Sequence, residues 1–238
     1  MGQGIQQAPV PQGGGSNALL DILKVLYEPG AVFERVRERP KFLVPFLVII
    51  VVQCVLFFVN LPYLKVAVAA QMATAAQGRP APSGGMLAAF GLIGLVIVLT
   101  VIFLLSGLIL WVLASVLGGG EAKYGTLLSV VVYAAVPSAI LLTIVGTIVL
   151  HMRGESGLTS PQDMQPALGL DLLAPGAKGF VGAVLKAINP FSVWGVVLTA
   201  IGVTTTQRTS KGTGYTIAIV AFVISLLIAG GLASLSPR

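Results

Sequence analysis

The segment MLAAFGLIGLVIVLTVIFLLSGLILWVLASVL, residues 86–117, carries no charged side chain and marks the chain as a membrane protein. At about 1.5 Å per residue, a helix of this length is longer than the roughly 30 Å of hydrocarbon in a bilayer. The segment therefore predicts a membrane-spanning helix that tilts, protrudes or begins after Met86.

The composition of the whole chain supports the same class of protein. Of its 238 residues, 56% are hydrophobic and 9% are charged, and the mean hydropathy is +0.97. Soluble domains carry roughly a quarter charged residues, so soluble globular, disordered and disulfide-scaffold proteins are excluded. With Cys54 as its one cysteine and His151 as its one histidine, the chain has too few such ligands for a structural zinc site.

Four further apolar stretches bring the predicted number of spans to five. They predict an all-α integral membrane protein, with a five-helix transmembrane bundle over residues 42–238 and N-terminal amphipathic interfacial helices. The predicted spans cover about residues 42–61, 86–117, 127–150, 190–206 and 215–235. A loop is expected over residues 65–85, between the first two spans.

The third and fourth spans contain prolines with different expected roles. Pro137 lies inside the third span, where it frees the backbone carbonyl of Tyr133 and predicts a kink. Pro190 suits the first position of the fourth span, with Asn189 as its N-cap. Before that span, one apolar helical face predicts a short interfacial helix, formed by Phe180, Val181, Val184, Leu185 and Ile188.

Few polar side chains lie inside the predicted spans. The span cores contain no Asp, Glu, Lys, Arg or His, which argues against a proton relay or an intramembrane aspartyl protease. The candidate intramembrane residues are instead Gln53, Asn60, Tyr133 and Pro137. They predict either interhelical hydrogen bonds around the kink or the lining of a small polar cavity. We expect no catalytic, metal-binding or cofactor-binding residue.

The residues before the first span have a different character. Residues 1–16, which are uncharged and rich in Gly, Gln and Pro, predict a disordered tail. Residues 17–41 predict an amphipathic cytoplasmic segment of two short helices, broken at Pro29-Gly30. Its apolar side chains either lie on the membrane surface or pack against the ends of the spans, and the two interpretations are compatible. The candidate residues for binding a partner or lipid are Phe33, Arg35, Arg37, Arg39 and Lys41.

The same basic cluster predicts the orientation of the chain. Lys and Arg concentrate in cytoplasmic loops near span ends, and this cluster lies directly before the first span. We therefore expect the N-terminus in the cytoplasm, and five spans then place the C-terminus outside. The basic residues form no long stripe and accompany no nucleic-acid-binding motif, so no nucleic-acid partner is expected.

Three segments resemble the bacterial branch of the YIP family, named for Ypt/Rab-interacting proteins. In EPGAVFERVRERPKFLVPFLVII, residues 28–50, Pro29, Phe33 and Pro40 precede the first span, as in that family. YAAVP, residues 133–137, resembles the family's Tyr-x-x-x-Pro element, and NPFSVWGVVLTAIGV, residues 189–203, resembles its fourth-span segment. The eukaryotic Asp-Leu-x-Gly-Pro element is absent, so the resemblance does not extend to binding of Rab-type GTPases.

The resemblance, over residues 19–235, implies a non-enzymatic multipass protein, and the bacterial-like motifs indicate a bacterial plasma membrane. Together with the basic cluster it favours a membrane scaffold or organiser that binds anionic lipid or an unknown membrane or cytosolic protein. Homo-oligomers are also possible, because Ser225, Ala229 and Ala233 repeat at helical spacing, although such residues equally serve packing within one chain.

Two other classes of function compete with the scaffold hypothesis. A small permease or channel for a neutral solute would use Gln53, Asn60, Tyr133 and residues 204–206 as its lining. A lipid-modifying enzyme would need a general base or metal carboxylates at the interface. The side chains available for such a site are scattered along the chain and form no motif. They are Glu121, His151, Glu155, Asp163 and Asp171.

Overall fold

A computed structural model describes residues 16–74 and 82–235, and these residues form helices and connecting loops without a strand. The predicted all-α fold is therefore confirmed. The predicted tail lies outside the described residues except for Ser16, which begins the first helix. The helices are α1 (Ser16–Lys24), α2 (Pro29–Glu38), α3 (Leu43–Thr74), α4 (Gly84–Leu117), α5 (Tyr124–Ala134), η1 (Pro137–Leu141), α6 (Leu142–Arg153), η2 (Pro161–Met164), η3 (Leu170–Leu173), α7 (Gly179–Ala187), α8 (Pro190–Gln207) and α9 (Lys211–Leu235).

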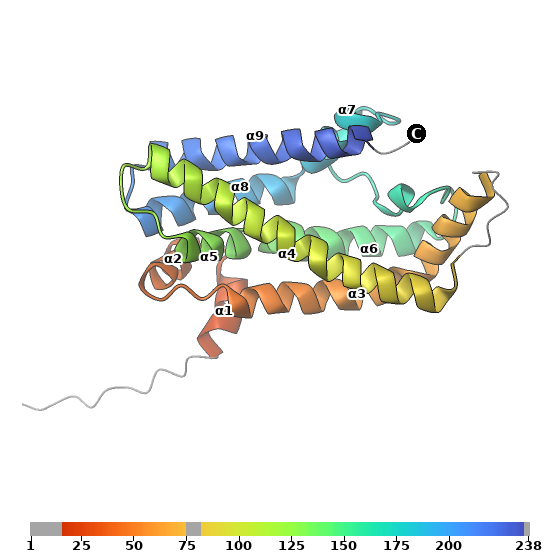
Figure 1. The fold of residues 1–238 in the computed structure, drawn as a ribbon, viewed down its shortest axis with the longest axis horizontal. Helices are drawn as coiled ribbons and strands as arrows, with labels where there is room; N and C mark the ends of the chain where they lie inside the picture. Colours follow the sequence, from red (N-terminus) through yellow and green to blue (C-terminus); the bar gives the residue numbers. More distant parts are fainter. Residues whose placement is uncertain (1–15, 75–81, 236–238) are drawn as a thin grey trace, which may run out of the picture.

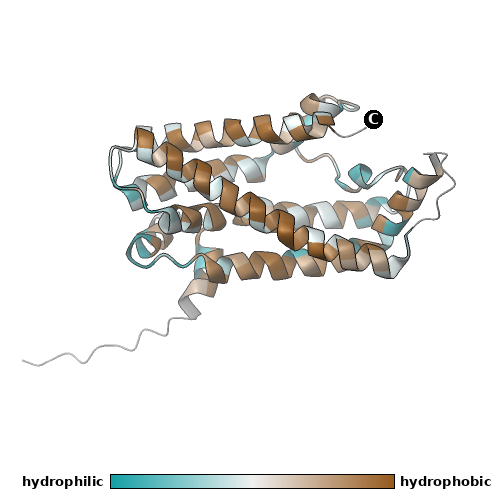
Figure 2. Cartoon of the chain, viewed as in Figure 1, coloured by the Kyte–Doolittle hydropathy of each residue, from teal (hydrophilic) through white to brown (hydrophobic). Residues whose placement is uncertain are grey.

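The long helices lie side by side in an elongated apolar bundle (Figures 1 and 2). Within the described residues, three helices, α3, α4 and α9, are each long and apolar enough to cross a membrane, and the number of candidate spans is five if each of two bent helix pairs counts as one span. Hydrophilic residues gather toward the two ends of the bundle (Figure 2). This arrangement confirms a membrane-spanning helical bundle.

Helix α3 is longer than the sequence pattern predicted. It continues past Leu61 to Thr74, so the first half of the predicted loop 65–85 is helical. The Ala-rich stretch from Ala67 to Ala73 explains the extension, because alanine has the highest helix propensity. Pro62, inside the helix, is exposed and does not end it.

The third span is bent at Pro137, as the sequence predicted. The axes of the segments Tyr124–Ala134 and Pro137–Arg153 differ by 41°, and a short π-helical turn, η1, begins at the proline. Helix α8 approaches closely here, since a Cβ atom added to Gly195 would lie 3.1 Å from the carbonyl oxygen of Ala134. The kink is thus packed against backbone of the fourth span.

The fourth span begins as predicted, after a separate helix. Helix α7 precedes α8 at an angle of 65°. Asn189 is buried, and its side chain accepts a hydrogen bond from the backbone N–H of Ser192 at 3.0 Å. Its side-chain amide donates to the carbonyl of Lys186 at 3.1 Å, and Pro190 occupies the first turn of α8. Asn189 therefore joins the end of α7 to the start of α8.

Replacing Asn189 by alanine is expected to lower the free energy of unfolding by about 1 kcal/mol, the usual value of a lost N-cap. The loss follows because the N–H of Ser192 and the carbonyl of Lys186 both lose a buried partner. Denaturant unfolding in micelles measures it. Ser83→Ala is the matched control, because Ser83 caps α4 through Met86 at an exposed position. Equal effects of the two substitutions would contradict the special role of Asn189.

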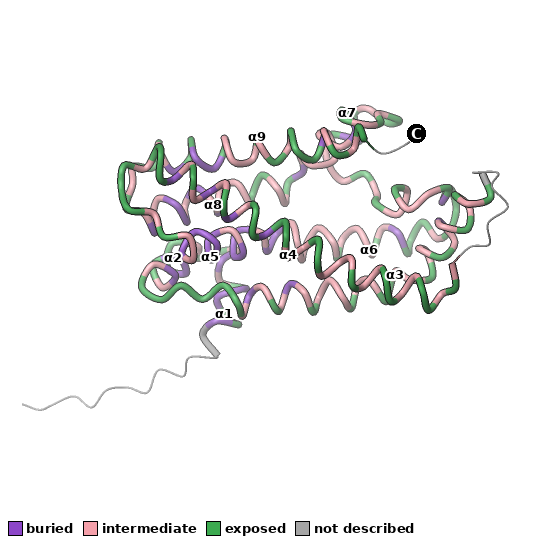
Figure 3. The backbone as a smooth tube through the Cα atoms, in the orientation of Figure 1, coloured by how far each residue is buried: buried purple, intermediate pink, exposed green. Residues whose placement is uncertain are grey.

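Helices α1 and α2 lie at one end of the bundle, whereas the C-terminal end of α9 lies at the other end (Figure 1). Buried residues concentrate around α2 and α5 (Figure 3). One core cluster joins the N-terminal helices to the spans, and it includes Val32, Phe33, Val36, Leu127, Val130, Tyr133, Leu198 and Val203. We call α1 and α2 together the N-terminal hairpin.

Candidate functional site

Phe33 anchors the N-terminal hairpin inside the bundle. Its side chain is fully buried in the core cluster shared with α5 and α8. A Cβ atom added to Gly202 of α8 would lie 3.0 Å from Cε1 of Phe33 and 2.5 Å from Cγ1 of Val130. The ring therefore occupies space that glycine leaves open. In this structure Phe33 belongs to the core and is not presented to a partner.

Arg35 holds α2 against α1. Its guanidinium contacts the carboxylate of Asp21 at 2.5 Å through Nη2 and 3.3 Å through Nε. The side chain of Asp21 is 11% exposed and that of Arg35 is 42% exposed. The hydrogen bond to Asp21 raises the pKa of Arg35 above its ordinary value, against the opposing effect of partial burial. Arg35 thus remains charged and serves as an internal tie.

Arg37 ties the hairpin to the fourth span. Its Nη1 donates to the carbonyl oxygen of Thr205 at 3.5 Å, and its Nη2 pairs with Glu34 at 2.6 Å. Thr205 lies in the last turn of α8, where helix carbonyls lack partners within the helix. Arg39 and Lys41 are exposed beyond the end of α2. Five residues were predicted to bind a partner or lipid. Of these, Phe33, Arg35 and Arg37 hold the hairpin in place, whereas Arg39 and Lys41 are exposed.

Helix α1 carries a second apolar side that faces away from the bundle. Ala18, Ile22 and Val25 are buried, whereas other apolar residues of the same segment are exposed. The outer face of α1, as we call it, consists of Leu19 (55% exposed), Leu20 (51%) and Leu23 (61%) on the helix, together with Tyr27 (66%) in the turn that follows it. Exposed Leu43 and Leu47 at the start of α3, against which α1 packs, add further apolar surface. Large exposed apolar patches mark membrane or protein contacts.

The predicted intramembrane residues divide into two separate places. Gln53 donates to the carbonyl of Ala139, in the π-helical turn, and to Oγ1 of Thr143 at 3.0 Å. Asn60 donates to Oγ1 of Thr147 at 2.9 Å. We call the contact between α3 and α6 made by these residues the polar seam. Its hydrogen bonds join the first and third spans, in agreement with the prediction that these polar residues make interhelical hydrogen bonds around the kink.

Tyr133 is not part of the polar seam. It is buried in the core cluster beside Phe33, at the end of the bundle that holds the N-terminal hairpin. Pro137 is buried between these two regions, at the start of the π-helical turn. Tyr133 and Gln53 therefore serve different contacts.

Replacing Gln53 by leucine is expected to destabilise the bundle by about 0.6 kcal/mol, and by no more than about 1.7 kcal/mol. Interhelical hydrogen bonds in membranes have such modest values, and leucine keeps the apolar packing of α3. Thermal unfolding in micelles measures the change. Val55→Leu, at an exposed position of the same helix, is the control. A loss well above 2 kcal/mol would indicate that Gln53 does more than join α3 to α6.

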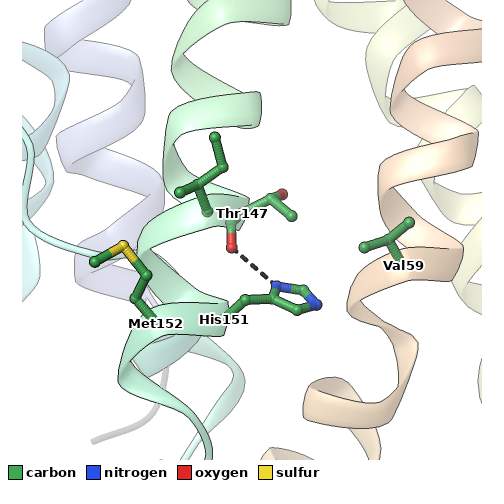
Figure 4. A pocket seen from close by; sticks show the side chains of 5 residues that line it. Val59, Thr147, His151 and Met152 are labelled. Carbon is green, nitrogen blue, oxygen red and sulfur yellow. Dashed lines mark hydrogen bonds between the residues drawn. The ribbon is translucent and has the colours of Figure 1, made fainter.

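The polar seam ends at a groove between α3 and α6 (Figure 4). The groove has a volume of about 380 Å³ and is lined by Val59, Thr147, Ile148, His151 and Met152. Nδ1 of His151 lies 2.9 Å from the carbonyl oxygen of Thr147, and the imidazole meets the ring of Tyr63 edge to face at 4.7 Å between centroids. His151 lies near the end of α6, two residues before Arg153.

Two of the acidic residues considered for an enzymatic site, Asp163 and Asp171, hold the loop between α6 and α7 together. Asp163 accepts hydrogen bonds from the backbone and side chains of Thr159 and Ser160. Asp171 accepts one from the backbone of Gly169 at 2.9 Å. Within residues 16–74 and 82–235, no group of three His, Cys, Asp or Glu residues is arranged to hold a metal ion.

Acid is expected to loosen the loop around Asp163. Burial raises the pKa of this carboxyl, but the hydrogen bonds from Thr159 and Ser160 outweigh it, so the pKa lies below its ordinary value. A lowered folded-state pKa contributes stability above the unfolded value of about 3.9, and this stability is lost as pH falls through the folded pKa. Hydrogen exchange at Ser160 should accelerate in that range. Asp163→Asn should abolish this pH dependence, and an unchanged profile would contradict the assignment.

Asp21, Thr143 and Thr147 were not singled out from the sequence. Asp21 is flanked by the buried apolar residues Ala18, Ile22 and Val25, and a charge in that position signals a buried partner. Thr143, Thr147 and His151 recur every four residues and so share one face of α6. This spacing was visible in the sequence, whereas the partners on α3 were not.

The chain matches known proteins along most of its length. The family model described as the Yip1 domain matches residues 23–233. The chain is similar to the membrane protein YknW of Bacillus subtilis (strain 168), with 28% identity over 204 residues that cover 84% of each chain. No solved structure matches it. The matched region covers the N-terminal hairpin from Leu23 onward and all the candidate spans except the last two residues of α9, and the chain belongs to the Yip1 domain family.

Proposed function

We propose that the chain is a non-enzymatic membrane organiser of a bacterial plasma membrane, and that its N-terminal hairpin contacts anionic lipid or a partner protein on the cytoplasmic side. The observation that carries this proposal is the outer face of α1. Its leucines and Tyr27 are exposed, although the opposite side of the same helix is buried in the bundle. A helix held this way presents a fixed apolar surface at the end of the spans.

The contacts that hold the N-terminal hairpin on the spans support the proposal, because they fix the position of its outer face. Phe33 fills space beside Gly202, Arg35 pairs with Asp21, and Arg37 binds the end of α8. Since these contacts fix the hairpin on the spans, binding at α1 would act on the bundle itself. Arg39 and Lys41, exposed beyond the hairpin, add positive charge worth about 1 kcal/mol each near an anionic leaflet.

The arrangement of the polar residues favours an organiser over a permease. Gln53 and Asn60 are engaged with α6, whereas Tyr133 lies in the core cluster beside the hairpin. The Oγ1 atom of Thr206 donates to the carbonyl of Gly202 within its own helix. The residues expected to line a solute path thus lie in different parts of the bundle, where Gln53, Asn60 and Thr206 each donate a hydrogen bond to a helix. No observation on the described residues favours the lipid-modifying enzyme either.

Photocrosslinking in native membranes tests the proposal. A photoreactive amino acid replaces Leu20 or Arg39, and the matched control probe replaces Val55, which is exposed on α3 away from the hairpin. We expect a reproducible protein adduct, or enrichment of anionic lipid, at the first two positions and not at Val55.

Two results would contradict the organiser. Adducts at Leu20 and Arg39 that match the bulk lipid found at Val55 would remove the binding surface. Flux of a neutral solute through vesicles containing the reconstituted chain, abolished by Gln53→Leu, would establish the permease instead.

A further inference from the structure

We infer that the groove between α3 and α6 binds a membrane lipid whose headgroup donates a hydrogen bond to Nε2 of His151. This site lies at the end of α6, away from the N-terminal hairpin, and is independent of the organiser proposal (Figures 1 and 4). The inference rests on the geometry of the imidazole, the walls of the groove and its position at a span end.

The backbone fixes which nitrogen of His151 can accept. Nδ1 lies 2.9 Å from the carbonyl oxygen of Thr147, and a carbonyl accepts hydrogen bonds without donating them. In the neutral ring Nδ1 therefore carries the proton, and Nε2 is an acceptor. The structure gives Nε2 no hydrogen-bond partner among the residues it describes. The contact with Tyr63 also holds the plane of the ring.

The walls of the groove suit an aliphatic chain. Val59 of α3 faces His151 across the opening (Figure 4), and the lining also includes the apolar side chains of Ile148 and Met152 from α6. These three residues are 44%, 53% and 83% exposed, so the groove is open to the outside of the bundle. Methionine adapts its shape to irregular neighbours. The lining contains no carboxylate or basic side chain besides the imidazole.

The position of the groove places its polar edge among lipid headgroups. His151 lies two residues before Arg153, the last residue of α6, and basic residues at span ends lie in the interfacial region. A lipid seated here places an acyl chain against Val59 and Ile148 and its headgroup beside Nε2. The matching headgroup must donate a hydrogen bond, as the ammonium of phosphatidylethanolamine or a glycerol hydroxyl of phosphatidylglycerol does. Phosphatidylcholine has no such donor.

A second hydrogen-bond acceptor, which is buried near the groove, also favours a ligand that donates hydrogen bonds. Oδ1 of Asn60 is buried without a hydrogen-bond partner among the described residues, while the amide of the same side chain binds Thr147. Thr147 thus connects Asn60 with His151. This end of the polar seam thus holds two acceptors that receive no hydrogen bond from the described residues, Oδ1 of Asn60 and Nε2 of His151, and this favours a donor-bearing ligand or bridging water over a second acceptor.

The single histidine of the chain makes the test specific. The full chain, labelled with ¹⁵N-histidine, is reconstituted in bilayers of phosphatidylcholine alone, or with added phosphatidylethanolamine or phosphatidylglycerol, at one fixed pH. Solid-state NMR then reads both imidazole nitrogens. We expect a protonated Nδ1, and an Nε2 to which only water can donate, in phosphatidylcholine. Adding either donor lipid should move the Nε2 signal toward that of a hydrogen-bonded nitrogen, and a response to one lipid alone would identify its donor group.

Variants separate lipid binding from effects of the bulk membrane. Val59→Trp fills the groove and should abolish the response of Nε2, whereas Val55→Trp, one turn away at an exposed position, should preserve it. The inference is overturned by identical Nε2 signals in all three bilayers or by a response that survives Val59→Trp. Protonation of both nitrogens in the anionic bilayer would also overturn it, because that result reflects surface acidity.

Discussion

Phe33→Ala releases the N-terminal hairpin from the bundle and lowers the free energy of unfolding by about 3–5 kcal/mol. The ring is fully buried between α5 and α8, and its removal leaves a cavity that backbone at Gly202 cannot fill. Globular domains are stable by only about 5–15 kcal/mol, so a loss of this size dominates the docking of a short hairpin. Protease cleavage between Lys24 and Arg35 in micelles measures the release.

Two further variants show whether the effect belongs to this contact. Leu23→Ala, on the outer face of α1, is the control and should change cleavage little, because its side chain is already 61% exposed. Gly202→Val approaches the same contact from α8, and its side chain would collide with Val130 and the Phe33 ring. It should release the hairpin while Phe33 itself is intact. Protection that persists in both Phe33→Ala and Gly202→Val would contradict the docking of α2.

Arg35→Met should destabilise the hairpin by about 2–3 kcal/mol, because it leaves the carboxylate of Asp21 without its partner. Breaking a fully buried ion pair costs roughly 3–5 kcal/mol, and the partial exposure of Arg35 reduces this value. The effect comes from an uncompensated charge more than from lost attraction. Removing the charge as well should therefore restore most of the stability.

The double variant Asp21→Asn with Arg35→Met tests this explanation. We expect it to be more stable than Arg35→Met alone, with an interaction free energy of about 1–2 kcal/mol in the double-mutant cycle. The pair of Arg37 with Glu34, three residues apart on α2, provides a comparison cycle within one helix. Ion pairs one turn apart on a helix usually couple by about 0.3–0.5 kcal/mol. Additive losses at Asp21 and Arg35 would show that the tie contributes nothing to docking.

The sequence predicted those features of the fold that depend on local backbone chemistry. Pro137 produced the expected kink, and Asn189 with Pro190 began the fourth span as expected. These residues act through their own dihedral angles and hydrogen bonds, so neighbours in the chain suffice to predict them. The helix of the first span continues to Thr74, into the predicted loop, because a helix can continue beyond the apolar stretch when many of the following residues are alanines.

The contacts of the candidate residues could not be predicted in the same way. Both sides of α1 are apolar, so periodicity alone did not show that Ile22 would be buried and Leu23 exposed. Arg35 and Arg37 looked like members of one basic cluster, yet each has a partner far away in the chain. Such pairs depend on the packing of helices, which the spacing of residues in one helix does not contain.

Cysteine labelling in sealed vesicles tests most directly whether residues 16–38 are built into the bundle on the cytoplasmic side. Cys54 is first replaced by serine, and single cysteines are placed at Val36, which is buried, and at Arg39, which is exposed. With a membrane-impermeant maleimide, the cysteine at position 39 should react only in inverted vesicles, and the one at position 36 should stay protected in both orientations until the protein is denatured. Equal labelling of the two positions in native membranes would contradict a docked hairpin, and labelling of position 39 only in right-side-out vesicles would contradict its cytoplasmic location.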